Sequence, residues 1–198
     1  MFKIIIKTAL KTLLIVLVAA ALAFAVASLG FPRSMASFCE KCGNYSMSAA
    51  YYSLSFSYTG DIDDLARTVS NNVEAENHAN TSSFGDKLIS NSNFNGYCED
   101  KSKDLGLDYR QYICGKICIA KYEADGIDSA LSCAVEAMRH VEGFPRGNAL
   151  MQLILKVNTK RDKNGGEKLL TEIEKIVPLE QQTEYYEQSK NILIELIR

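Results

Sequence analysis

Cysteine is the residue type in this chain with the widest range of chemistry. Six cysteines occur, at positions 39, 42, 98, 114, 118 and 133. Cys39 and Cys42 have the C-x-x-C spacing that binds zinc or exchanges disulfides. Disulfide exchange by this motif requires a βαβ context, which the sequence does not predict, and a zinc site requires a second pair of ligands. Cys114 and Cys118, one helical turn apart, are the only second pair that the spacing provides.

Cys114 and Cys118 also fit the buried face of a helix, because Tyr122 continues their pattern at i, i+4 and i+8. Free cysteine behaves as a small hydrophobic residue. We therefore expect core packing first, a disulfide second and a metal site third. The even number of cysteines and the predicted export described below favour a disulfide, for which Cys39 and Cys42 are the expected local pair. The other pairings stay open.

The remaining candidates for catalysis are weak. The chain has two histidines, His78 in a polar stretch and His140 at a predicted helix end, and neither accompanies a G-x-S-x-G or similar motif. A solvated or capping histidine is the expected role for both. We therefore expect no catalytic, cofactor-binding or metal-binding residues, and we do not expect an enzyme.

The charge of the chain excludes nucleic acid as a partner. There are 22 basic and 24 acidic side chains, which give a net charge of −2. Three of the basic residues, Lys3, Lys7 and Lys11, lie in residues 1–32, where there is no acidic residue. Residues 33–198 therefore carry a net negative charge, without the basic patch that binds DNA or RNA.

A segment able to cross a membrane lies near the N-terminus. Residues 12–31, TLLIVLVAAALAFAVASLGF, contain no charge. Twenty residues of helix span roughly 30 Å, which is the thickness of the hydrocarbon core of a bilayer. The lysines before the segment predict a cytoplasmic N-terminus and an extracytoplasmic C-terminal domain. Residues 1–32 are thus expected to be a basic N-terminus with a single-pass signal anchor.

A cleaved signal peptide is the competing interpretation. Ala25-Val26-Ala27 has the small residues of a cleavage site, and the basic N-terminus fits it. The apolar run is longer than the usual apolar region of a signal peptide, which favours the anchor. Both interpretations place residues 33–198 on the far side of the membrane.

Residues 33–198 show apolar residues at helical spacing and no strand-like alternation of useful length. The fold class is therefore predicted to be all-α. The expected helices are 46–58, 61–73, 109–124, 126–138, 148–157, 166–177 and 182–197. They form pairs separated by short polar breaks at Gly60, Gly126 and Gly165-Gly166. Residues 74–106, rich in Asn, Ser, Asp and Gly, are expected to be a polar insertion, mostly exposed loop with one or two short helices.

The paired helices resemble the tetratricopeptide-repeat family. The resemblance lies in an aromatic residue near the end of the first helix (Tyr58, Tyr122), the glycine that follows, and a small residue early in the second helix (Ala66, Ala130). Val177-Pro178 is similar to the proline that closes such a repeat. The resemblance implies a solenoid that binds proteins on a concave surface. A generic bundle of helical hairpins is the alternative.

Three functions follow as hypotheses. The first is a membrane-anchored protein-interaction or scaffold module on the outer side of the membrane, with an unidentified protein partner. The second is an exported thiol or disulfide protein that uses Cys39 and Cys42. The third is a small accessory subunit of a membrane complex, held by the alanine-rich face of its membrane helix, which comprises Ala19, Ala20, Ala21, Ala23, Ala25 and Ala27.

The last predicted helix carries a possible docking surface. Its apolar stripe continues to Leu193, Leu196 and Ile197, next to the C-terminus of the chain. In one interpretation this stripe covers the end of the helical array, as terminal helices do in solenoids. In the other it extends past the last packed hairpin and binds a partner.

Overall fold

The computed structural model describes residues 2–139, 141–177 and 182–198. Within these ranges it describes the side chains from Leu10 onwards, except that of Ala23. The predicted roles of His140, Pro178, Ala23 and the side chains of Lys3 and Lys7 lie outside the described part. The described chain is all-helical, as predicted. Its helices are α1 (Phe2–Gly30), α2 (Pro32–Lys41), α3 (Tyr45–Thr59), α4 (Ile62–Glu74), α5 (His78–Ile89), α6 (Phe94–Leu105), α7 (Tyr109–Asp125), α8 (Ile127–Met138), α9 (Ala149–Lys160), α10 (Lys163–Ile176) and α11 (Glu184–Ile197).

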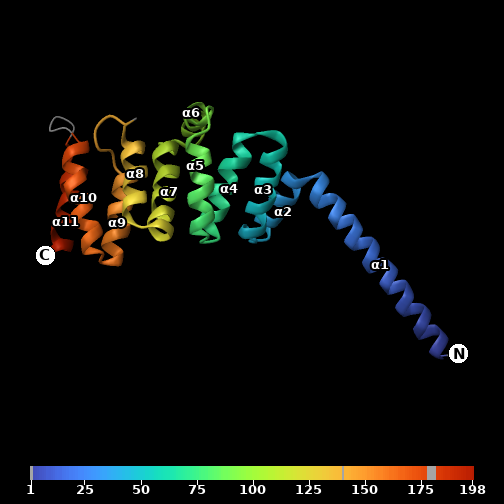
Figure 1. Ribbon diagram of the computed structural model, residues 1–198. Coiled ribbons are helices and arrows are strands. Elements are labelled where there is room, and N and C mark those ends of the chain that lie inside the picture. The colour runs from blue at the N-terminus through green and yellow to red at the C-terminus, as the bar shows by residue number, and fades with distance from the viewer. Residues whose placement is uncertain (1, 140, 178–181) are drawn as a thin grey trace.

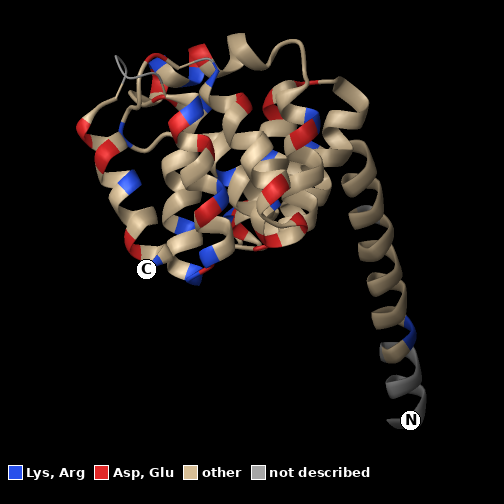
Figure 2. Cartoon of the chain, turned by 60° about the vertical axis from the view of Figure 1, so that its left-hand side comes forward, with Lys and Arg blue, Asp and Glu red and all other residues tan. Residues whose placement is uncertain are grey.

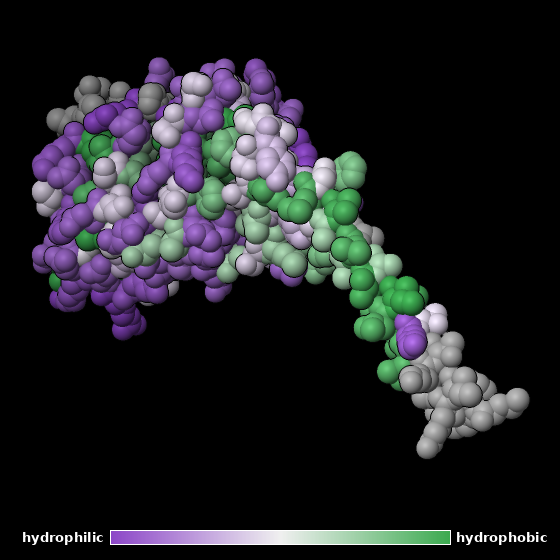
Figure 3. Space-filling model, turned by 45° about the vertical axis from the view of Figure 1, so that its right-hand side comes forward, coloured by the Kyte–Doolittle hydropathy of each residue, from purple (hydrophilic) through white to green (hydrophobic). Residues whose placement is uncertain are grey.

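Helix α1 stands apart from the others and extends away from them (Figure 1). Its segment Leu10–Gly30 is long and apolar enough to cross a membrane. Lys11 is the one charged residue in that segment (Figure 2), and apolar side chains cover its surface (Figure 3). Such a surface is unfavourable in water and favourable in lipid.

Helices α2 to α11 follow one another in a row in chain order, with α6 set across one end of its neighbours (Figure 1). Neighbouring helices pack as hairpins, for example α3 on α4 and α7 on α8. Packing also links every second helix towards the C-terminus, since α7 contacts α9 and α9 contacts α11. The largest apolar core extends along the row from α4 to α11.

Two predicted helix ends are confirmed. Gly60 and Gly126 have φ angles of 68° and 87°, in the left-handed region that other residues rarely adopt. The break predicted at Gly165-Gly166 is wrong, because both glycines lie inside α10. The actual break is at Arg161, with φ 54°, and Asp162 caps α10 by accepting a hydrogen bond from the Gly165 amide.

Gly166, the second glycine of this pair, has a role in helix packing. A Cβ atom at Gly166 would lie 2.9 Å from Cδ2 of Leu196 in α11, which is too close for a real contact. Gly85 in α5 is similar, because a Cβ there would lie 2.6 Å from Cγ2 of Ile117 in α7. These glycines therefore allow neighbouring helices to approach closely.

The one or two short helices expected within residues 74–106 are present, but the prediction that most of this segment is exposed loop is wrong. This segment forms α5 and α6. Asn77 caps α5 by accepting a hydrogen bond from the Asn80 amide, and Leu88 and Phe94 are completely or almost completely buried. The polar composition hid the helices because few residues of each face the core. Helix α2 was not predicted at all, although Pro32 occupies the first helical position, where proline is favoured.

Candidate functional site

The first notable site is the junction between α1 and the row of helices. The Tyr51 hydroxyl of α3 donates a hydrogen bond to the buried Ser28 hydroxyl of α1, at 3.0 Å. Three residues after the end of α1, the guanidinium of Arg33 contacts three carboxylates at the start of α4. The distances are 2.7 Å to Asp61, 2.9 Å to Asp63 and 3.2 Å to Asp64. These contacts fix α1 and α2 to the α3–α4 hairpin.

Asp64 and Asp63 extend the junction into the hairpin. Asp64 is completely buried and accepts a hydrogen bond of 2.6 Å from the Ser55 hydroxyl of α3. Asp63 contacts Arg67 at 3.0 Å and Lys101 of α6 at 3.2 Å. Burial alone would raise the pKa of Asp63, but the hydrogen bonds from Arg67 and Lys101 outweigh it and hold the pKa below its ordinary value. Asp63 is therefore charged at neutral pH and binds both cations.

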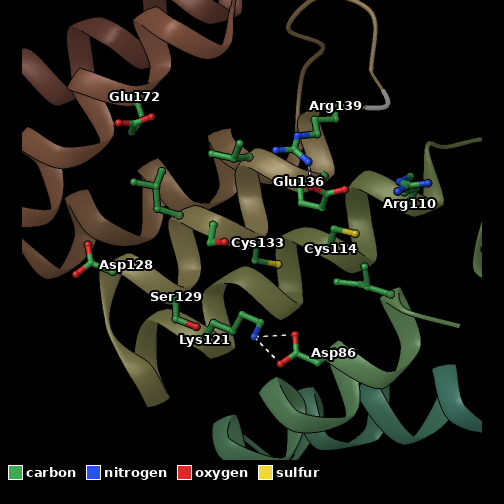
Figure 4. Close-up of a pocket in the computed structure, with 15 residues that line it drawn as sticks. Asp86, Arg110, Cys114, Lys121, Asp128, Ser129, Cys133, Glu136, Arg139 and Glu172 are labelled. Atoms are coloured by element: carbon green, nitrogen blue, oxygen red, sulfur yellow. Dashed lines mark hydrogen bonds and ion pairs between the residues drawn. The ribbon is translucent and has the colours of Figure 1, made fainter.

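The second site is a groove over α8, with a volume of about 630 Å³. Its lining comes mainly from α5, α7, α8 and α10. The apolar side chains of the lining are Ile89, Leu131, Val135 and Ala137, together with Cys114 and Cys133. Four acidic and three basic side chains surround them: Asp86, Asp128, Glu136, Glu172, Arg110, Lys121 and Arg139 (Figure 4).

Most of the charges around this α8 groove form ion pairs within the chain. Lys121 contacts Asp86 at 2.8 Å across α7 and α5. Arg139 contacts Glu136 at 2.6 Å, and Lys168 of α10 contacts Asp128 at 2.6 Å. The groove thus offers an apolar floor with a rim of paired charges. Such a surface suits an amphipathic segment better than a small ion.

The groove explains one wrong core prediction. Leu65, Val69, Ala134, Ile173 and Val177 are buried, as their spacing predicted. Leu131, expected in the same core, is only partly buried, because it lines the groove on the face of α8 that no helix covers. Periodicity identifies the apolar face of a helix but not whether a neighbour packs on every part of it.

Four buried cysteines lie on α6, α7 and α8, and two of them, Cys114 and Cys133, line the groove. Cys98 of α6, Cys114 and Cys118 of α7, and Cys133 of α8 are all buried. Burial raises the pKa of Cys98 and of Cys114 to about 12 each, so these thiols are protonated at neutral pH. The Sγ atoms of Cys118 and Cys133 lie 2.9 Å apart. No group of three or more metal-binding side chains with suitable geometry occurs among the described residues.

The pair expected to form a local disulfide, Cys39 and Cys42, lies at the end of α2. Both are free thiols, and they differ in exposure, since Cys39 is buried and Cys42 is exposed at the helix C-terminus. Burial, and to a lesser degree the proximity of Cys42, raises the pKa of Cys39. A raised pKa lowers the thiolate fraction, which opposes use of Cys39 as a nucleophile.

The predicted docking residues of α11 face inwards. Leu193 is completely buried, Leu196 is 9% exposed and Ile197 is partly buried. Leu196 packs over Gly166 of α10, and α11 also contacts α9. This arrangement corresponds to the covering role of a terminal helix and leaves little of the stripe for a partner. The groove over α8 was missed from the sequence, because it forms where α5, α7, α8 and α10 meet, and α5 and α10 are far apart in the chain.

Comparison with known proteins adds no assignment at this point. No protein-family model, no curated protein and no solved structure shows a significant match to the chain. The functional argument therefore depends on the geometry of the junction and of the groove.

Proposed function

We propose that this chain is a single-pass membrane protein that presents an array of helical hairpins as a protein-interaction module on the outer side of the membrane. The observation that carries the proposal is the α8 groove, whose floor is formed by apolar side chains of α8 and its neighbours. Helical arrays of this kind commonly bind proteins along a concave surface. The contacts of α7 with α9 and of α9 with α11 support an array of stacked hairpins.

The membrane part of the proposal is supported by α1. Leu10–Gly30 is long enough and apolar enough to span a bilayer. Lys3 and Lys7 before this segment and Lys11 at its start favour a cytoplasmic N-terminus, and with this proposed orientation α2 to α11 lie outside. The junction at Arg33 then holds the array against the end of the span.

The partner proposed for the groove is an amphipathic helix of another protein. The apolar floor formed by residues such as Leu131 and Val135 matches the apolar side chains of such a helix, and the rim provides both signs of charge. Because the rim charges already pair within the chain, the rim fixes orientation more than it adds affinity.

The topology is tested with Cys42, which is the one exposed cysteine among the six. A membrane-impermeant maleimide added to intact cells should label the wild-type chain and should not label a Cys42→Ser variant. Labelling of Cys42 only after permeabilisation would show the opposite orientation to the one proposed.

The groove is tested by site-specific photo-crosslinking in cells. A photoreactive residue at Ser132, exposed on α8 and lining the groove, should give a discrete protein adduct. The same residue at Ser83, exposed on α5 outside the groove, is the matched control and should give none. Val135→Glu, which places a charge on the groove floor, should abolish the Ser132 adduct. Equal adducts at both positions would refute a specific groove.

A further inference from the structure

The cysteine pair beside the groove suggests covalent chemistry that neither the sequence nor the proposed function assigns. Cys118 lies in α7 and Cys133 in α8, on facing sides of the hairpin. Their Sγ atoms are 2.9 Å apart, and closing a disulfide requires an approach of only roughly 1 Å, to about 2.05 Å. Helices α7 and α8 are the most extensively packed pair in the row, so the two sulfur atoms are held in place.

The two sulfurs differ in access. Cys118 is completely buried and belongs to the apolar core that also contains Ile117 and Ala134. Burial is the main cause that raises its pKa well above the ordinary value. Cys133 lines the α8 groove and is 9% exposed. Figure 4 shows its sulfur between Cys114 and the Lys121–Asp86 ion pair. A reactant in the groove can therefore reach Cys133 but not Cys118.

We propose that Cys118 and Cys133 form a disulfide that joins α7 to α8, and that Cys133 is the sulfur through which it forms. The proposal rests on the proposed function in one respect, because an extracytoplasmic domain is exposed to disulfide donors. The donor is a disulfide of the class to which oxidised glutathione and disulfide oxidoreductases belong.

The reaction proceeds by two thiol–disulfide exchanges. The thiolate of Cys133 attacks the donor disulfide, forms a mixed disulfide and releases one donor thiolate. Burial keeps the thiolate fraction of Cys118 low, but the sulfur that it attacks is held beside it in the same molecule. The Cys118 thiolate then attacks the Cys133 sulfur, closes the bond between the two cysteines and releases the second donor thiolate. The two protein thiols lose two protons and two electrons in total, and the donor disulfide gains both electrons and is reduced to two thiols.

Trypsin allows a direct test, because the cysteines fall in different peptides. Cleavage after Arg110, Lys116, Lys121 and Arg139 places Cys114, Cys118 and Cys133 in the peptides 111–116, 117–121 and 122–139. Full-length protein is alkylated in denaturant without reductant, directly from membranes, and digested. We expect peptide 117–121 joined to peptide 122–139, and loss of this species on reduction.

Variants and a second measurement identify the cause of any failure. Cys114→Ser should retain the linked peptides, and Cys118→Ser should abolish them. A link between peptides 111–116 and 122–139 in wild-type protein would overturn the pairing. Full-length protein in detergent is also incubated with oxidised glutathione. If the link forms there but is absent from membranes, the pairing stands and the proposed location fails. If alkylated Cys118 and Cys133 persist after oxidation, the disulfide proposal is overturned.

Discussion

Hairpins α3–α4 and α7–α8 have the same architecture but different chemistry across their interfaces. Each connects two helices through a glycine with positive φ, Gly60 in one and Gly126 in the other. The α3–α4 interface contains a buried hydrogen bond between Ser55 and Asp64, which continues into the ion pairs of Arg33. The α7–α8 interface contains two sulfur atoms in contact and no buried carboxylate among the described residues.

The difference follows from the neighbours of each hairpin. Helices α1 and α2 pack beside hairpin α3–α4, and the carboxylates of α4 hold Arg33 of α2. Orienting an adjoining helix in this way requires directional contacts. Hairpin α7–α8 lies within the row and borders the groove, so its contacts hold the surface that we propose binds a partner. One hairpin is therefore expected to respond to pH and the other to redox conditions.

The largest effect should be common to both hairpins, because their apolar cores are equivalent. Leu65 in α4 and Ile117 in α7 are both completely buried. Leu65→Ala and Ile117→Ala should each lower the free energy of unfolding by about 2–5 kcal/mol. Ile119→Ala, at a partly exposed position of α7, is the matched control and should cost less. Denaturant unfolding of the full chain in detergent micelles measures the free energy of unfolding of all three variants. If only one of the two buried positions shows a large loss, the apolar cores of the two hairpins are not equivalent.

A reductant should destabilise hairpin α7–α8 and leave hairpin α3–α4 unchanged. If the proposed disulfide closes the 15-residue interval between Cys118 and Cys133, reductant should lower stability by about 3 kcal/mol. Hydrogen exchange should become faster for the amides of α7 and α8 and stay unchanged in α3 and α4. Cys118→Ser should exchange at the faster rate with or without reductant. Acceleration in α3–α4 alone would contradict the assignment of redox sensitivity.

Removal of the buried carboxylate should weaken the junction. Asp64→Ala leaves the Ser55 hydroxyl buried without its acceptor, and we expect a loss of about 1–3 kcal/mol in the free energy of unfolding. Asp100→Ala is the matched control, because that side chain is 81% exposed and should change stability by less than about 0.5 kcal/mol. Equal values for the two variants would mean that the buried hydrogen bond contributes nothing net.

Acid should produce the smallest effect, again at α3–α4. The folded-state pKa of Asp63 is below its unfolded value of about 3.9, so its ionised form stabilises the fold above about pH 4. This contribution is lost as pH falls through the folded-state pKa. The midpoint temperature of thermal unfolding should therefore fall more steeply between pH 6 and pH 3 for the wild type than for Asp63→Asn. Parallel pH profiles would exclude a role for Asp63 ionisation.

The sequence predicted the parts of the fold that depend on local patterns. The helical class follows from apolar spacing, the ends at Gly60 and Gly126 follow from glycine at a polar break, and the apolar helix follows from the uncharged run 12–31. The failures share a different cause. Gly166 was interpreted as a break because its partner, Leu196, is thirty residues away in the chain.

The candidate site depends on long-range packing in the same way. Cys118 and Cys133 belong to stripes that predict burial, but no pattern within either helix shows that their sulfur atoms meet. Arg33 follows an apolar run and carries no motif, yet its three carboxylate partners lie some thirty residues further along. The exposure of Leu131 depends on how α8 packs against α7, α9 and α10, which no pattern within α8 shows.

The junction between α1 and the row limits the orientations in which the groove can bind a partner. Only Phe31 separates α1 from α2, and the Tyr51–Ser28 and Arg33 contacts brace the two sides. If α1 spans a bilayer as proposed, the lipid restricts its tilt, and the braced array shares that restriction. In that arrangement the groove stays within a narrow range of heights and inclinations above the lipid. A partner confined to the same membrane would lose less rotational freedom on binding than a partner from solution.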